Sequence, residues 1–124
     1  MKILLLTVGL LAGLAAGLGA EDAPATGPRA GMYNILSYGA VGRPPLHLGY
    51  VEILAGNKYR SWRPGKVLAG EGEYRYDAGA RTVTWASGPY KEENWGGEFS
   101  ADNGGKTHKI RLKRTTVAVN TARQ

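Results

Sequence analysis

Aromatic and β-branched residues recur at every second position in short runs between residues 31 and 114, and Gly-, Pro- and Asn-rich breaks separate these runs. The alternation is typical of strands, because successive side chains of a strand point to opposite faces. No ten residues of this region have the apolar period of a helix. An aromatic sheet face that no helix covers must curl on itself or pack on a second sheet. We therefore predict an all-β fold, a small antiparallel meander of about six to eight strands closed as a barrel or sandwich.

The clearest strand signal is a hairpin over residues 72–87. Tyr74 and Tyr76 share one face, a turn with the sequence Asp-Ala-Gly-Ala follows, and Val83 and Trp85 share a face on the return. Three more candidate strands and a second hairpin lie at residues 32–38, 46–55, 58–62 and 97–114.

Residues 1–20 have the three parts of a secretory signal: a positive start, an apolar centre and a small-residue end. We expect cleavage after Ala20 and a periplasmic or extracellular location. The alternative is a retained anchor, because the stretch from Ile3 to Ala20 is just long enough to cross a bilayer, which takes roughly 17–25 residues. Lys2 before this stretch and acidic residues after it place the remainder outside the cell under either interpretation.

The region after the signal divides into a linker, a domain and a tail. Residues 21–30 are rich in Ala, Pro and Gly and have no apolar period, which indicates a flexible linker. The β domain is expected at residues 31–114. Residues 115–124 are either a frayed tail or one more short strand.

Composition narrows the class of protein and of partner. The chain has no cysteine, so its stability must come from burial and hydrogen bonding, without the disulfides that many small exported domains use. This favours a bacterial origin. The net charge of +6 favours anionic partners such as a polymer or an envelope surface, although it also simply keeps a protein soluble.

Motifs for catalysis or metal binding are missing from the sequence. No cysteine is present, no serine lies in a Gly-x-Ser-x-Gly motif, and the two histidines, His47 and His108, are far apart. His108 would share one face of a strand with Ile110 and Leu112, so we expect it at the edge of the core. Three acidic residues near a Gly-Gly pair are expected to be solvated or to bind a cation weakly: Glu92, Glu93 and Glu98. We predict no catalytic residue, no cofactor and no metal site.

Cations interleaved with aromatic residues are the strongest binding signal, because such surfaces bind anionic chains and stack sugars or bases. Lys and Arg on exposed strands also discourage edge-to-edge pairing, which is the structural alternative. Trp95 could offer an exposed ring to a sugar or fold over an open barrel end as a plug, and the plug is the interpretation we favour. The candidate binding residues are Lys58, Tyr59, Arg60, Trp62, Arg63, Trp95, Lys109, Arg111 and Lys113.

Turn glycines and aromatic residues also carry a resemblance over residues 31–114. The motifs are Gly31-x-Tyr33, Gly49-Tyr50-Val51-Glu52-Ile53-Leu54-x-Gly56-Asn57-x-Tyr59, Gly72-x-Tyr74-x-Tyr76, Val83-x-Trp85-x-Ser87-Gly88-Pro89-Tyr90, Gly97-x-Phe99 and Ile110-x-Leu112. In these the chain resembles a group of small exported bacterial proteins of unknown function. Members of that group carry a cysteine near the first strand, where Ile35 or a neighbour stands here, so any role of that cysteine does not carry over. The resemblance implies a fold and an export route and brings no activity.

Three functional hypotheses remain at this point. The first is a non-enzymatic binding or structural module of the cell envelope with a basic aromatic surface. The second is a small barrel that carries a hydrophobic ligand inside. The third is an enzyme, which would need a charged cluster around His47 or His108 that the sequence does not reveal.

Overall fold

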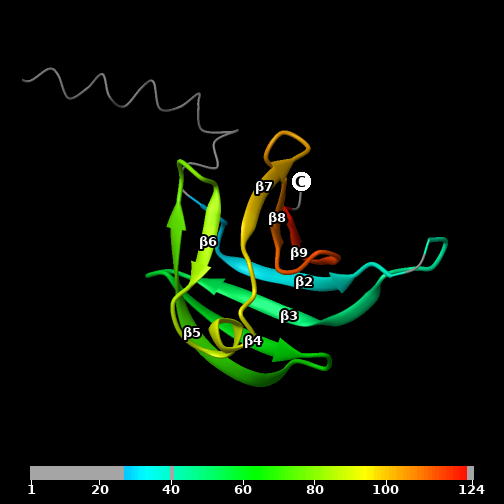
Figure 1. The fold of residues 1–124 in the computed structure, drawn as a ribbon, viewed down its shortest axis with the longest axis horizontal. Coiled ribbons are helices and arrows are strands. Elements are labelled where there is room, and N and C mark those ends of the chain that lie inside the picture. Colours follow the sequence, from blue (N-terminus) through cyan, green and yellow to red (C-terminus); the bar gives the residue numbers. More distant parts are fainter. Residues whose placement is uncertain (1–26, 40, 123–124) are drawn as a thin grey trace, which may run out of the picture.

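The structure, a computed structural model, describes residues 27–39 and 41–122, in which eight antiparallel strands form a closed barrel (Figure 1). The predicted all-β meander is therefore confirmed, and the closure is that of a barrel. The expected signal at residues 1–20 lies outside the described residues. The strands are β2 (Gly31–Ser37), β3 (Leu46–Leu54), β4 (Lys58–Arg63), β5 (Val67–Asp77), β6 (Thr82–Trp85), β7 (Glu98–Asp102), β8 (Thr107–Arg111) and β9 (Thr116–Thr121).

Each strand pairs with the next along the chain, and β9 returns to pair with β2, with Ile35 opposite Ala118. The expected boundary at Arg114 therefore falls short of the barrel, because β9 is the strand that closes it. Of the two alternatives for residues 115–124, residues 116–121 form the strand. The pairing is thinnest between β6 and β7, where Thr82 and Glu98 are the one aligned pair. Two backbone hydrogen bonds supplement that pair, including one from the Val83 N–H to the Gly97 carbonyl at 2.8 Å.

The interior of the barrel is filled by the side chains that the alternation predicts to face inward. Tyr33, Tyr59 and Phe99 are among the largest fully buried ones, at 2% exposure or less. The buried core consists of Tyr33, Ile35, Val51, Ile53, Tyr59, Tyr74, Val83, Trp85, Tyr90, Phe99, Ile110, Leu112 and Ala118.

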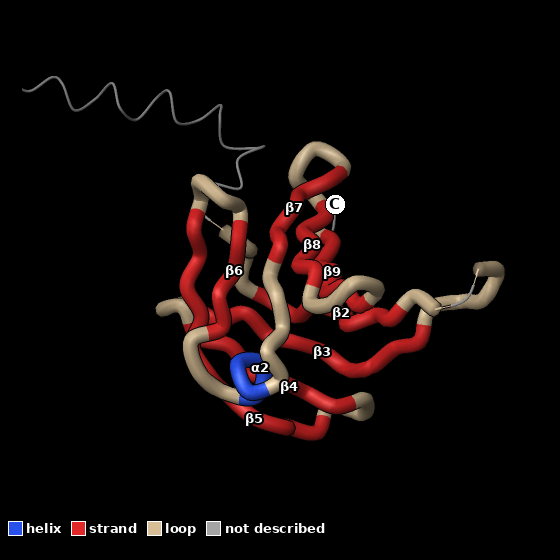
Figure 2. The backbone as a smooth tube through the Cα atoms, in the orientation of Figure 1, coloured by secondary structure: helices blue, strands red, loops and turns tan. Residues whose placement is uncertain are grey.

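A short helix, α2 (Pro89–Glu92), closes one end of the barrel, and we call this the α2 end (Figure 2). Gly70 and Gly72 on β5 make room for it. A Cβ on Gly70 would lie 2.9 Å from the Pro89 ring, and one on Gly72 would overlap the Ser87 carbonyl. Tyr90 of α2 enters the space left free and packs on Tyr59. Because Gly70 and Gly72 have no side chains, the Tyr90 ring fits into this end of the barrel and closes it.

Residues 27–30 close the other end, which we call the Arg29 end. The structure corrects the expected linker here, because Gly27 and Pro28 are buried and Gly27 lies against the Tyr76 ring. The Arg29 guanidinium donates to the Asn120 side-chain oxygen at 2.7 Å, to the Gly105 carbonyl at 3.3 Å and to the Lys106 carbonyl. These residues belong to the barrel, and the rest of the expected linker, residues 21–26, lies outside the described residues.

Candidate functional site

The candidate binding residues fall into two groups on opposite sides of the barrel. The first group lies on and beside β4 and the second on and beside β8, and these strands are four positions apart in either direction around the eight-stranded barrel. Neighbouring strands lie about 4.8 Å apart, so no short ligand reaches both groups. The sequence suggested one basic aromatic surface, whereas the fold separates it into two.

The β4 group is largely neutralised by carboxylates. Arg60 has a guanidinium nitrogen 3.9 Å from a carboxylate oxygen of Glu52 and another 3.9 Å from one of Glu71. Glu73 stands opposite Lys58 in the pairing of β4 with β5. With Arg63 at the end of β4, the group therefore carries three cations, and the carboxylates of Glu52, Glu71 and Glu73 match them in number, which does not favour an anionic ligand.

Tyr59 borders a depression of about 320 Å³ between Lys58 and Glu73, but it has 0% exposure and lies in the core. Its hydroxyl donates to the Ser87 carbonyl at 2.7 Å and accepts from the Tyr90 N–H at 3.0 Å. Burial raises the pKa of the Tyr59 phenol, which therefore stays neutral over the physiological range. The assignment of Tyr59 as a binding residue is corrected, since a ligand outside the barrel would not reach its ring.

Trp62 does face outward on β4, and Arg63 at the end of that strand is exposed. The indole N–H of Trp62 donates to the Glu52 carboxylate at 3.1 Å. Tyr50 stands opposite Trp62 on β3, and its ring contacts His47 edge-on at 4.8 Å between centroids. His47 in turn lies 3.2 Å from the Asn34 side-chain oxygen, so this histidine is engaged on the outer face of the sheet.

The β8 group forms an outward stripe of cations. Lys109 and Arg111 alternate with the buried Ile110, so they point away from the core. Lys109 makes a 3.0 Å ion pair with Asp102, and the Arg111 Nε donates to Glu98 at 3.2 Å. Both pairs are exposed, and exposed ion pairs contribute only about 0–1 kcal/mol. An incoming anion would therefore displace these carboxylates at little cost.

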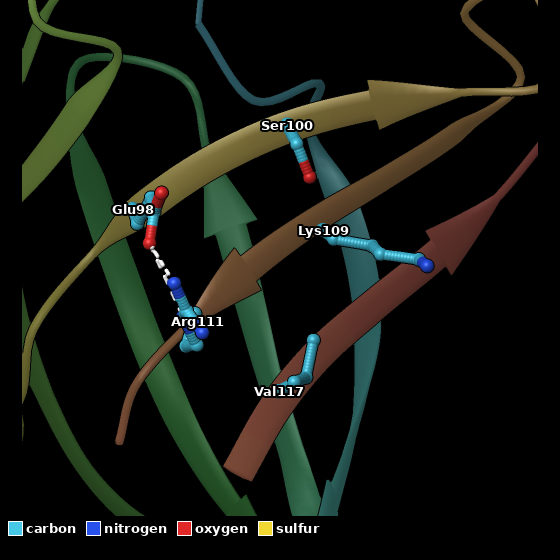
Figure 3. Close-up of a pocket in the computed structure, with 5 residues that line it drawn as sticks. All are labelled: Glu98, Ser100, Lys109, Arg111 and Val117. Atoms are coloured by element: carbon cyan, nitrogen blue, oxygen red, sulfur yellow. Dashed lines mark hydrogen bonds and ion pairs between the residues drawn. The ribbon is translucent and has the colours of Figure 1, made fainter. Parts of the chain in front are cut away.

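A depression of about 180 Å³ lies over this stripe, and its walls come from three adjacent strands (Figure 3). Glu98 and Arg111 face each other at one side of it, and the Lys109 side chain extends over the other. The hydroxyl of Ser100 and the methyl groups of Val117 complete the lining. The depression thus offers two cations, one carboxylate, one hydroxyl and one small apolar surface.

A second depression of about 400 Å³ continues from the first, since Glu98 and Arg111 line both. Lys113 and Arg114, from the turn after β8, add two cations to its wall. The whole stripe therefore carries four cations, Lys109, Arg111, Lys113 and Arg114, against the two carboxylates of Glu98 and Asp102. Sequence reasoning missed Arg114, although its place after Lys113 was a usable signal.

Trp95 lies at the α2 end beside the second depression. Its ring packs on Tyr90 at 4.5 Å between centroids and joins the edge of the core, as the plug interpretation predicts. The Lys113 ammonium lies 5.9 Å from the centre of the Trp95 ring, within the range of a cation–π contact. Trp95 therefore supports Lys113 at the end of the stripe.

His108 faces inward at the Arg29 end, where the Arg29 backbone and the Phe99 ring contact it. Its Nδ1 accepts the Arg29 backbone N–H at 3.1 Å, and its ring contacts Phe99 edge-on at 5.1 Å. Burial and, to a smaller extent, the nearby Arg29 charge lower the pKa of His108. This placement agrees with the expected position at the core edge. The role of Arg29 was missed because an isolated Arg in a Pro- and Gly-rich segment has no local pattern.

Neither a metal cluster nor a bilayer-spanning helix is found in the described part of the chain. In residues 27–39 and 41–122, no three His, Cys, Asp or Glu side chains converge in a way that could hold an ion. In the same residues, no helix has the length and apolar character needed to cross a bilayer.

Comparison of the chain with protein-family models, with curated proteins and with solved structures found no match. The class that fold and site define together is a small, side-chain-filled eight-stranded barrel with a cationic stripe on its outer face.

Proposed function

We propose that this chain is an exported, non-enzymatic binding module of the cell envelope that holds an anionic polymer along the β8 stripe, Lys109, Arg111, Lys113 and Arg114. The observation that carries the proposal is the excess of cations at this one place, where two connected depressions follow the strand. The outward residues of a strand repeat about every 6.8 Å. A polymer with regularly spaced phosphate, sulfate or carboxylate groups suits such a row of charges.

The geometry favours this function over the hydrophobic carrier. The interior is occupied by large aromatic side chains such as Tyr33, Tyr59 and Phe99. α2 covers one end, and residues 27–30 cover the other. A hydrophobic ligand would have to displace several of these groups at once. The resemblance to exported bacterial proteins fits an envelope module and stays a prediction.

Binding to a fluorescent heparin fragment, with neutral dextran as the uncharged probe, tests the proposal. We expect heparin binding whose affinity falls steeply with salt, because the ligand releases counterions and surface charges are screened. Lys109→Gln/Arg111→Gln/Lys113→Gln should weaken binding by about tenfold or more at low salt and flatten the salt dependence.

A variant with the same loss of charge elsewhere serves as the control. Lys58→Gln/Arg63→Gln/Arg75→Gln removes three exposed cations on or beside β4 and β5. This control should bind heparin nearly as well as the wild type. Equal weakening in both triple variants would show that only the net charge matters and would overturn the assignment to β8. Binding to neutral dextran with the same affinity as to heparin would overturn it as well.

A further inference from the structure

The exposed apolar side chains gather in two neighbouring hairpins. Within the described residues, every large hydrophobic side chain that is exposed lies on the hairpin that joins β2 to β3 or on the one that joins β4 to β5. Val41 is 101% exposed, Leu46 65% and Val67 53%. We call the following residues the hairpin patch: Tyr38, Val41, Leu46, Leu48, Val67 and Leu68, together with the cations Arg43, Arg63 and Lys66.

The two hairpins are side by side because β3 pairs with β4. Tyr50 stands opposite Trp62, and Gly49 lies against the backbone of Trp62 and Arg63. The Lys66 ammonium lies 5.7 Å from the centre of the Tyr50 ring, which connects the second hairpin to β3. In Figure 1 the β2–β3 hairpin projects to the right of the barrel, and the turn between β4 and β5 lies below it on the same side. The patch is therefore formed by two neighbouring hairpins on one side of the protein.

The charge of the patch has one sign. Residues 38–48 and 62–70 contain three cations, Arg43, Arg63 and Lys66, and no Asp or Glu. An apolar surface bordered by cations complements an anionic lipid surface, where the apolar side chains enter the headgroup region and the cations remain among the phosphates. Tyr38 adds an exposed aromatic residue of the kind that prefers the membrane–water interface. A second copy of the chain would bring the same cations against these, which opposes self-association through the patch.

We propose that the hairpin patch docks peripherally on an anionic phospholipid bilayer. This surface differs from the β8 stripe in position and in chemistry, because the stripe has no exposed large apolar side chain. Two separate surfaces would allow the barrel to lie on a membrane while its β8 stripe remains available to a polymer.

The docking is tested by co-sedimentation of the protein with phospholipid vesicles. The protein is purified as the cells produce it, without truncation. The vesicles are phosphatidylcholine alone and phosphatidylcholine with about one third phosphatidylglycerol. We expect binding to the anionic vesicles that weakens with added salt. Arg63→Gln/Lys66→Gln should weaken it about 25-fold, at about 5-fold for each cation. Leu46→Ser/Val67→Ser, at two exposed positions, should weaken it at unchanged charge.

Lys109→Gln/Arg111→Gln removes the same charge from the β8 stripe and should leave vesicle binding nearly unchanged. Three outcomes would overturn the docking proposal: no binding to anionic vesicles, equal loss in both charge variants, or a dimer in size-exclusion chromatography that Leu46→Ser/Val67→Ser abolishes. Heparin binding without vesicle binding would reject the lipid surface alone. Vesicle binding without heparin binding would reject the β8 proposal alone.

Discussion

Tyr59 stacks on Tyr90 with ring centroids 4.8 Å apart and 20° between the ring planes, and its hydroxyl accepts the Tyr90 backbone N–H at 3.0 Å. The same hydroxyl donates to the Ser87 carbonyl at 2.7 Å. One side chain of β4 therefore holds both the entry to α2 and its aromatic plug. Ser87 is also tied to β5, since its N–H donates to the Glu73 carbonyl at 3.3 Å and its hydroxyl oxygen accepts the Glu73 N–H at 3.0 Å. We infer that Tyr59 positions α2 together with these contacts to β5.

Tyr59→Phe should lower the free energy of unfolding by about 2–4 kcal/mol, because a buried N–H and a carbonyl lose the partner that serves both. Urea denaturation followed by circular dichroism measures the loss. The control is Tyr38→Phe, which removes a hydroxyl from a half-exposed ring and should stay within about 0.5 kcal/mol of the wild type. A Tyr59→Phe protein as stable as this control would show that the hydroxyl does not hold α2.

Gly97, directly before β7, lies against Val83 of β6. A Cβ at Gly97 would overlap the Val83 carbonyl oxygen, whereas one at the adjacent Gly96 would lie 3.7 Å from its nearest neighbour, the Leu112 carbonyl oxygen. Gly97→Ala should therefore destabilise the barrel by about 1–3 kcal/mol, the usual cost of overpacking. Gly96→Ala should have an effect within about 0.5 kcal/mol. Thermal melts of the two variants check the contrast, and equal melting temperatures would contradict a closed seam between β6 and β7.

The tryptophans at the α2 end should differ in their response to loss of the indole N–H. Trp85 is buried and donates to the Gly96 carbonyl at 2.9 Å, whereas the Trp95 N–H has no partner among the described residues. Trp85→Phe loses a hydrogen bond and buried volume, so we expect a loss of about 2–3 kcal/mol. Trp95→Phe keeps an aromatic ring near Tyr90 and should cost about 1 kcal/mol or less. Denaturant titration distinguishes the two, and a larger loss at Trp95 would contradict this assignment.

Stability should fall as the pH drops through about 6.5, the ordinary value of a histidine. Burial and then Arg29 lower the pKa of His108 in the folded state, so the unfolded chain takes up a proton that the folded chain resists. The stabilisation is complete above about 6.5 and is lost as the pH falls from there toward the lower folded pKa. Protonation would also remove the Nδ1 acceptor of the Arg29 N–H.

Melting temperatures between about pH 7.5 and 5.5 measure this dependence. His108→Asn, which keeps an acceptor but does not titrate, should flatten the curve. His47→Asn makes the same replacement on the outer face and should leave the fall in place. If the fall persists in His108→Asn and disappears in His47→Asn, the pH dependence comes from His47, and the prediction for His108 is contradicted.

The alternation of side chains between the two faces of each strand predicted the local structure well. Alternation alone placed Tyr74 on one face with Tyr76 and Val83 on one face with Trp85, and Tyr74, Val83 and Trp85 are buried. The same alternation placed Tyr59 on the opposite face of the strand from Lys58 and Arg60, and this signal should have removed Tyr59 from the candidate surface. The plug role of Trp95 was inferred from a Gly-rich loop beside an open end, and its contact with Tyr90 agrees with it.

The candidate site was predicted only in part. Lys109, Arg111 and Lys113 lie together because they share one stretch of chain, which sequence order already implies. Their neighbours Glu98 and Ser100 come from β7, and their inclusion depends on the register between two strands. The separation of the β4 group from the β8 group depends on closure of the whole barrel.

Alternation and turn residues, which act between near neighbours, determined that this chain forms short antiparallel strands with one aromatic face. Only the tertiary structure decided that β9 closes the barrel on β2, that the basic residues divide between opposite walls, and that residues 27–30 form part of the domain. Those features depend on contacts between distant residues, such as Arg29 and His108, 79 positions apart. Such contacts arise from packing and register around the closed sheet, and no local pattern encodes them.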